Sequence, residues 1–172
     1  MAKKREYTNK WMFNGQELNE VPTGAHGFVY LITDKETGMM YLGKKSFWSK
    51  RKLKPTDKRR TTVESDWKHY WSSSDKIKAI IKAQGTDRFE RIVLAVCQLE
   101  RHMNYLEVKY QFAFNILEQP DRWYNDNING CWYPHLYADV ASMTSIDKRA
   151  ISSVREYFDP PTERQQQWSS TQ

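Results

Sequence analysis

The chain has 172 residues, enough for one domain with a hydrophobic core and a modest appendage. A hydrophobic content of 39% and an aromatic content of 14% exclude a disordered chain and predict a globular fold. The N-terminus lacks the apolar stretch of a secretory signal, and no apolar run is long enough to span a bilayer. We therefore expect neither secretion by that route nor a place in a membrane. Cys97 and Cys131 form no CxxC pair, so we expect free thiols in a reducing cytoplasm, with one disulfide as the alternative.

Positive charge is concentrated in one stretch of the chain. The net charge is +6, and residues 44–60 alone carry nine Lys or Arg against one Asp, which leaves −2 for all other residues. Such a cluster repels itself unless a polyanion neutralises it. The stretch therefore favours binding to DNA or RNA, and a solvated loop without a partner is the alternative.

The first half of the chain begins with a polar segment and a hairpin. Residues 1–24 are polar with scattered aromatic side chains and predict a short, loosely packed arm. Residues 26–33 and 39–45 predict two antiparallel strands, joined by a turn over residues 34–38 whose glycine can adopt a positive φ. Residues 46–62 show no hydrophobic period and predict an exposed basic loop.

The second half predicts helices around one strand. Residues 63–71 predict a short helix, and residues 75–84 a second one that is capped by serines before it and by a glycine after it. Residues 89–97 are rich in β-branched and apolar side chains, which indicates a buried central strand. Residues 99–117 predict the longest helix, ended by Pro120.

This order of elements predicts an α+β fold, a small three-stranded antiparallel sheet flanked by helices, over residues 25–130. Residues 131–172 would form a C-terminal extension. Within it, residues 145–158 predict a small helix that either contacts a nucleic acid or packs against the domain, and a disordered tail follows.

Glu107 interrupts the apolar stripe of the longest predicted helix. On a helix it shares a face with Met103, Tyr110 and Phe114. A carboxylate on a buried face requires a metal, a basic residue or hydrogen bonds as its partner. The alternative is a carboxylate at the edge of the stripe that reaches water.

Tyr30 and Tyr41 raise a similar question on the hairpin. They lie eleven residues apart on adjacent strands, where they can share one face. A phenol can hydrogen-bond an attacking water or a phosphate oxygen, and it can accept a proton if cations lower its pKa. Packing within the sheet is the alternative for each tyrosine.

Several segments, in this order, resemble the GIY-YIG nuclease superfamily. The hairpin carries "FVY" at 28–30 and "YLG" at 41–43, and "AIIKAQGTDRFERIVL" at 79–94 resembles the helix, glycine turn and third strand of these nucleases.

Three site residues follow from the same comparison. "NYLEVKYQF" at 104–112 resembles the helix with the metal-binding glutamate, which is Glu107 here. "WYNDNI" at 123–128 resembles the segment with the family's asparagine, Asn125, and Arg51 in "SKRK" stands where the catalytic arginine is expected. Over residues 26–130 the resemblance is closest to phage-encoded Seg-like homing endonucleases, through the stretch at 65–74.

The resemblance implies hydrolysis of phosphodiester bonds in double-stranded DNA with one divalent cation, Mg²⁺ or Mn²⁺. Glu107 would bind the cation, as suits a hard oxygen donor. Tyr30 would orient or deprotonate the attacking water, with Tyr41 assisting. Arg51 would neutralise charge on the phosphate, and Asn125 would position groups around the site.

The basic stretch supplies the expected DNA contacts. Lys44 and Lys45 would contact the DNA backbone, or one of them would help to activate water. The other expected contacts are Lys50, Lys52, Arg59, Arg60 and Trp48, the tryptophan by stacking or wedging. Alternatives to Arg51 as the catalytic cation are Arg59, Arg60, Lys68 and His69.

The leading hypothesis is thus a metal-dependent DNA endonuclease of a phage, active in the cytoplasm of an infected bacterium. A non-catalytic nucleic-acid-binding protein on a degenerate nuclease scaffold and a structure-specific repair nuclease are the alternatives. One centre cuts one strand at a time, so a double-strand break would require a transient dimer or sequential nicking by a monomer.

Overall fold

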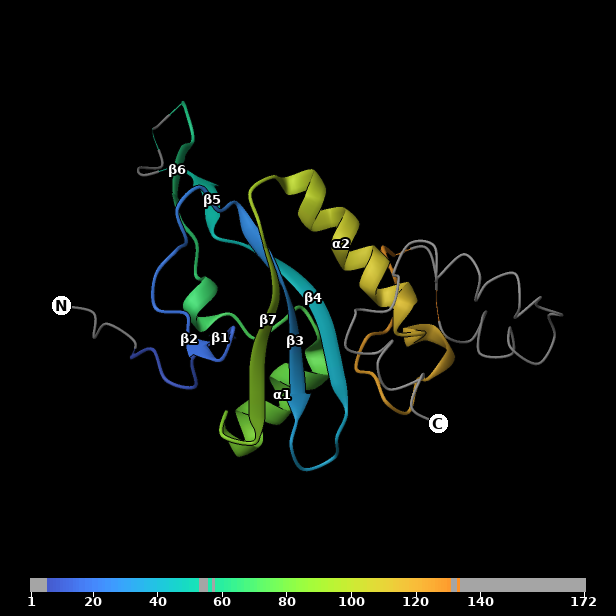
Figure 1. Ribbon diagram of the computed structural model, residues 1–172. Helices are drawn as coiled ribbons and strands as arrows, with labels where there is room; N and C mark the ends of the chain where they lie inside the picture. The colour runs from blue at the N-terminus through green and yellow to red at the C-terminus, as the bar shows by residue number, and fades with distance from the viewer. Residues whose placement is uncertain (1–5, 53–55, 57, 131–132, 134–172) are drawn as a thin grey trace, which may run out of the picture. The chain divides into compact units, whose positions relative to one another are not determined.

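A computed structural model describes residues 6–52, 56, 58–130 and 133 (Figure 1). The chain divides into two units, Met1–Ala138 and Asp139–Gln172, and the second lies outside the described residues. Cys131, the helix predicted at 145–158 and the predicted tail also lie outside them.

A five-stranded sheet in the order β2-β1-β7-β3-β4 forms the centre of the first unit (Figure 1). Its strands are β1 (Met12–Phe13), β2 (Gln16–Glu17), β3 (Gly27–Asp34), β4 (Met40–Ser46) and β7 (Phe89–Cys97). β3 pairs antiparallel with β4 and with β7, as predicted, whereas β1 pairs parallel with β7. The prediction of a three-stranded antiparallel sheet was therefore wrong in extent, because β7, β3 and β4 form one side of a larger mixed sheet that β1 and β2 extend beyond β7.

Residues 7–18 pack into the domain instead of forming part of a loosely packed arm. Trp11 is fully buried, and its indole N–H donates to the backbone carbonyl of Trp67 at 2.9 Å. Met12 pairs with Ile92 of β7. Strands of two residues are too short to show an alternating pattern, which is why the sequence did not reveal them.

Helix α1 (Asp75–Gln84) has the predicted boundaries. The Ser74 side chain accepts from the backbone N–H of Ile77 at the N-terminus, and Gly85 follows the last turn with φ +81°. Helix α2 (Glu100–Ala113) ends earlier than predicted.

The early end of α2 has a local cause. Asn115 adopts φ +51°, a left-handed conformation that asparagine tolerates and that a helix cannot continue through. A short 3-10 helix, η2 (Ile116–Glu118), follows. In the described part of the chain, no helix is both long and apolar enough to cross a bilayer.

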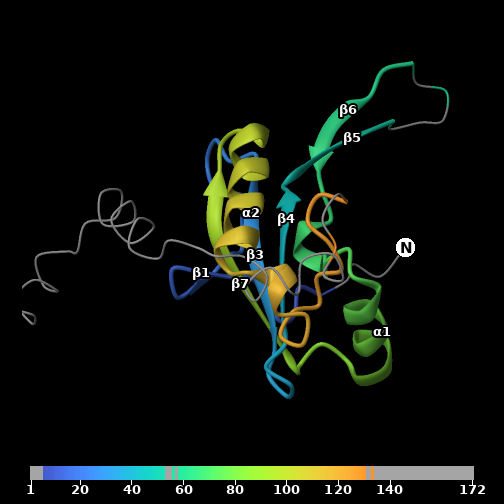
Figure 2. The same cartoon turned by 90° about the vertical axis from the view of Figure 1, so that its right-hand side faces the viewer.

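The two helices cover opposite faces of the sheet (Figures 1 and 2). Ile77 of α1 packs in the same core cluster as Tyr30, whereas Met103 of α2 packs with Val29 and the buried free thiol of Cys97. Alternate side chains of β3 thus enter the two cores, as a strand requires.

A separate two-stranded ribbon carries much of the basic stretch (Figure 2). It consists of β5 (Trp48–Arg51) and β6 (Thr61–Glu64) in antiparallel pairing. The prediction of a basic loop over residues 46–62 was therefore wrong for the residues that form β5 and the start of β6. The helix predicted over 63–71 was also wrong, because β6 occupies its start and only one 3-10 turn, η1 (Trp67–His69), follows.

Arg91 of β7 is a buried charge that joins several segments. Its guanidinium donates to the backbone carbonyls of Asn9 at 2.9 Å and Tyr70 at 3.0 Å, and lies 4.1 Å from the centre of the Trp71 ring. Burial lowers the pKa of Arg91 to about 10, so the side chain stays charged at neutral pH. Arg91 thereby fixes the backbone around Tyr70 against the sheet.

Candidate active site

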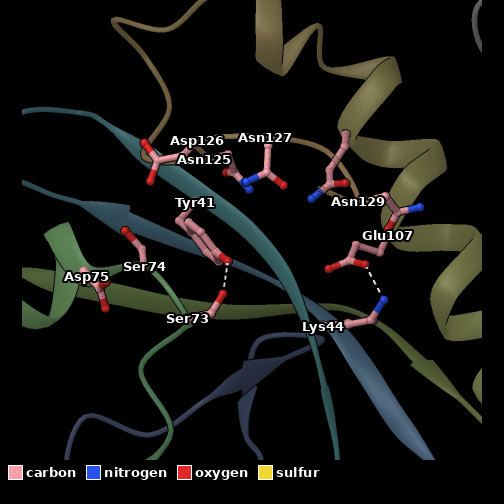
Figure 3. Close-up of a pocket in the computed structure, with 11 residues that line it drawn as sticks. Tyr41, Lys44, Ser73, Ser74, Asp75, Glu107, Asn125, Asp126, Asn127 and Asn129 are labelled. Carbon is pink, nitrogen blue, oxygen red and sulfur yellow. Dashed lines mark hydrogen bonds and ion pairs between the residues drawn. The ribbon is translucent and has the colours of Figure 1, made fainter. Parts of the chain in front are cut away.

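A pocket of about 340 Å³ lies along β4, at the outer edge of the sheet (Figure 3). Four segments contribute to it: β4, the turn before α1, helix α2 and the loop after η2. Its polar lining includes Tyr41, Lys44, Ser73, Glu107, Gln111 and Asn125. The pocket therefore combines three of the five predicted catalytic residues, namely Tyr41, Glu107 and Asn125.

Glu107 projects into this pocket from α2 (Figure 3). Its carboxylate Oε2 lies 2.7 Å from the Lys44 Nζ, and the Glu107 side chain is only 13% exposed. The carboxylate on the apolar stripe therefore has a basic partner, and it also opens onto the pocket. Lys44, at 33% exposure, remains open to the pocket.

Gln111 lies one helical turn after Glu107 and is almost completely buried. Its side-chain N–H donates to the Leu42 carbonyl at 3.4 Å, but its Oε1 has no hydrogen-bond partner among the described residues. A buried polar atom without a partner costs about 1–3 kcal/mol, so the fold alone does not account for this oxygen.

The donor set of the pocket fits a hard divalent cation. Glu107 offers a carboxylate, and Gln111, which also lines the pocket, has a buried amide oxygen that no described residue uses. Such oxygen ligands suit Mg²⁺, which keeps several waters of its own. In the described part of the chain, no group of three or more His, Cys, Asp or Glu could hold a metal ion, so most ligands of such an ion would be water.

Tyr30 and Tyr41 share one face of the hairpin but only Tyr41 lines the pocket. Their rings stack with centroids 6.2 Å apart, and Tyr30 is 1% exposed. A Cβ on Gly43 would lie 2.7 Å from the Tyr30 hydroxyl and 2.8 Å from the Tyr41 ring. The glycine of the "YLG" motif thus leaves the space that the two rings occupy.

The two phenols are protonated at neutral pH. Burial raises the pKa of Tyr41 and raises the pKa of Tyr30 well above its usual value, and the negative charge of Glu107 adds to both shifts. The condition for proton acceptance by these tyrosines, a pKa lowered by cations, is not met by the protein groups around them. Tyr41 faces the pocket as a hydrogen-bond donor, and Tyr30 lies beneath it.

Asn125 holds the outer edge of β4. Its side chain accepts from the backbone N–H of Leu42 at 3.0 Å and donates to the Leu42 carbonyl at 2.8 Å. These two bonds replace those that a further strand would make. Asn125 thereby fixes the strand segment from which Tyr41 and Lys44 project.

Arg51 lies outside this pocket, exposed at the end of β5. The four alternatives from the sequence do not line the pocket either: Arg59, Arg60, Lys68 and His69. Among the described residues, Lys44 is the one basic side chain that does.

The residues predicted to bind DNA lie mainly on the ribbon. Lys50, Lys52, Arg59 and Arg60 are exposed there or directly beside it. Trp48 is 40% exposed, although its indole N–H donates to the Ala25 carbonyl at 2.8 Å. Their role in DNA binding stays a prediction.

Comparison with protein families identifies the domain that carries this pocket. Residues 11–128 match the family described as "Putative endonuclease segE, GIY-YIG domain". The chain belongs to the GIY-YIG nuclease family. Within the family it is Seg-like. Neither the curated proteins nor the solved structures contain a match. The matched segment begins at Trp11, so this GIY-YIG domain includes the two short N-terminal strands.

Ser73 and Gln111 line the pocket of this GIY-YIG domain but were not among the predicted site residues. The serines at 72–74 were given no role in the site, yet Ser73 faces Tyr41. Gln111 carried a usable signal, because a glutamine four residues after Glu107 lies on the same helical face.

Proposed function

We propose that this GIY-YIG domain hydrolyses phosphodiester bonds of double-stranded DNA and requires Mg²⁺ or Mn²⁺. The pairing of Glu107 with Lys44, in the pocket lined by Tyr41, supports this proposal most directly. A carboxylate repels phosphate, so a surface that only binds DNA gains nothing from a glutamate held at 13% exposure beside its lysine. A nuclease that holds a cation between carboxylate and phosphate does gain from it.

Glu107 and the amide oxygen of Gln111 would hold the cation. When bound, such an ion polarises the phosphate and stabilises the leaving 3′-oxygen. Lys44 would offer its ammonium group to the same phosphate, because it projects into the pocket beside Glu107. The protonated Tyr41 hydroxyl would donate a hydrogen bond to a phosphate oxygen or orient the attacking water.

The basic ribbon would supply affinity outside the pocket. A two-stranded ribbon fits the major groove of B-DNA, and exposed Lys and Arg side chains on it can contact the backbone phosphates. We assign Arg51 to this binding surface, because it lies on β5 and does not line the pocket.

We further propose that the enzyme is a phage homing endonuclease, which its Seg-like family membership supports. A homing enzyme cuts one position in a long DNA. Mapping the ends produced from phage genomic DNA should therefore give one dominant site with one end polarity. Cleavage that follows branches or flaps irrespective of sequence would instead indicate a repair nuclease.

The test is cleavage of phage and plasmid DNA with Mg²⁺ or Mn²⁺ by the full chain. Glu107→Ala should reduce the cleavage rate on the order of 10³-fold and leave DNA binding intact. Glu100→Ala is the matched control, because Glu100 is an exposed glutamate of the same helix outside the pocket.

Two results would contradict the proposal. If the wild-type protein leaves DNA uncut with either metal, the chain is a non-catalytic nucleic-acid-binding protein. If Glu107→Ala cuts at the full rate, the cleavage centre lies elsewhere.

A further inference from the structure

The Tyr41 hydroxyl has a hydrogen-bond partner at the edge of the pocket. The Ser73 Oγ lies 2.8 Å from it (Figure 3). Either group can be the donor in this bond, and when Ser73 donates, the Tyr41 O–H stays available to a phosphate or a water. Ser73 and Tyr41 both line the pocket, whereas the neighbouring Tyr30 and Tyr70 do not.

The Tyr70 ring is held on several sides. It packs edge-on against Tyr30 with centroids 6.1 Å apart. The Lys45 Nζ lies 4.0 Å from the centre of the Tyr70 ring and 2.6 Å from a carboxylate oxygen of Asp66. The backbone carbonyl of Tyr70 accepts from Arg91 at 3.0 Å. Both the ring and the backbone of Tyr70 are therefore fixed.

The turn that presents Ser73 has an unusual backbone. Ser72 is buried and adopts φ +93°, a region that is unfavourable for a residue with a side chain. The Ser74 N–H donates to the Ser72 Oγ at 3.1 Å, and Ser74 caps α1. The surrounding contacts thus hold a strained turn whose central residue, Ser73, points its hydroxyl at Tyr41.

We propose that Ser73 is a positioning residue of the cleavage centre: it holds the Tyr41 hydroxyl in the direction needed for hydrogen bonding to the DNA phosphate or to the attacking water. This inference rests on the proposed nuclease function and deepens it. Tyr41 projects from an edge strand beside an open pocket, and its ring alone leaves the direction of the hydroxyl group undetermined. The hydrogen bond with Ser73 determines that direction, and the strained turn and the fixed Tyr70 segment before it hold Ser73 in place.

The experiment compares kcat and KM for Mg²⁺-dependent nicking of supercoiled plasmid by single and double variants. Ser73→Ala removes the hydrogen bond to Tyr41, and Tyr41→Phe removes the hydroxyl that it positions. Ser73→Ala should lower kcat about tenfold with KM unchanged, since one hydrogen bond in a fixed geometry is lost. The double variant should be no slower than Tyr41→Phe, because Ser73 acts only through the Tyr41 hydroxyl.

Rescue and control variants separate positioning from general damage. Ser73 is exposed and its site has room for a methyl group, so Ser73→Thr should restore kcat. Tyr105→Phe changes a tyrosine of α2 that is 66% exposed and outside the pocket, and should keep full activity.

The outcomes distinguish this inference from the proposed function. A wild-type protein that nicks DNA, with Ser73→Ala equally fast, overturns the inference and leaves the nuclease function standing. Effects on KM alone, or losses that multiply in the double variant, also overturn it. A wild-type protein that does not nick DNA overturns the nuclease function and the positioning role together.

Discussion

Asp34 and Glu107 are two carboxylates withdrawn from solvent near the same hairpin, but they differ in how fully they are paired. Asp34, at the turn end of β3, is completely buried. It accepts from Arg88 Nε at 2.9 Å and from the Tyr124 hydroxyl at 2.7 Å, besides two donors within the turn itself. Glu107 has one charged partner among the described residues, Lys44 at 2.7 Å, and it opens onto a pocket.

This difference is the reason for proposing a structural role for Asp34 and a functional role for Glu107. Fixed donors satisfy both oxygens of Asp34, which leaves no capacity for a ligand. Glu107 keeps that capacity, and the neighbouring oxygen of Gln111 has no partner in the described part of the chain. We infer that a ligand completes the site around Glu107, in keeping with the proposed cation.

The largest expected effect is on the free energy of unfolding, through Asp34 at the turn end of β3. Asp34→Ala should lower the free energy of unfolding by about 3–5 kcal/mol, because Arg88 and Tyr124 then lose their buried acceptor. Glu107→Ala should change it by less than about 1 kcal/mol, because Lys44 reaches solvent. Urea unfolding of both variants measures the difference. Equal losses in the two variants would contradict the distinction between them.

The pH dependence of stability should also come from Asp34. Burial alone would raise the pKa of Asp34, but hydrogen bonds from Arg88 and Tyr124 outweigh it and hold this pKa well below its usual value. The stabilisation is therefore complete above about pH 4, where the unfolded-state carboxyl ionises, and is lost as the pH falls below that value.

Urea unfolding between pH 5 and pH 2 checks this expectation. Wild type should lose on the order of 2 kcal/mol through Asp34 in that range, and Asp34→Asn should show a flatter profile. An unchanged slope in the variant would mean that other carboxyls dominate acid unfolding.

A smaller effect, on the metal dependence of cleavage, is expected for Gln111, the neighbour of Glu107. Gln111→Leu removes the unpartnered oxygen and should raise the Mg²⁺ concentration for half-maximal cleavage about tenfold, as loss of an outlying metal contact typically does. Stability should hold or rise, because a buried unsatisfied atom disappears. Gln98→Leu, at an exposed position before α2, is the control. Unchanged metal dependence in Gln111→Leu would remove Gln111 from the site.

The smallest expected effect is on DNA affinity, through the ribbon of β5 and β6. Lys50→Ala should weaken binding to any DNA sequence by less than about 1 kcal/mol and lower the slope of log affinity against log salt by about one. Lys82→Ala, an exposed lysine of α1, should change neither quantity. Binding measured by fluorescence anisotropy at several salt concentrations tests this, and equal effects of both variants would indicate diffuse charge instead of a defined surface.

The parts of the fold that were predicted are those with a local signal. The hairpin, β7 and α1 were correct because alternation, β-branched side chains and capping residues lie within each segment. The ribbon escaped prediction because its two strands pair with each other and bury little, which leaves no apolar alternation in the sequence. Arg91 could have been noticed, since in a strand it shares a face with Phe89 and Val93.

The site was predictable only in part, for a related reason. Glu107 contradicts the pattern of its own helix, so one segment sufficed to single it out. Tyr30 and Tyr41 share a face, and no local pattern says that the first is buried while the second lines the pocket. Ser73 meets Tyr41 across 32 residues of sequence, a contact that depends on tertiary packing alone.

Binding of Mn²⁺ to the protein without DNA, followed by electron paramagnetic resonance, tests the central assignment most directly. Wild type and Glu100→Gln should bind the ion with similar affinity, whereas Glu107→Gln should bind it at least about tenfold more weakly. Equal binding by wild type and Glu107→Gln would contradict the assignment of Glu107 as the residue that holds the cation.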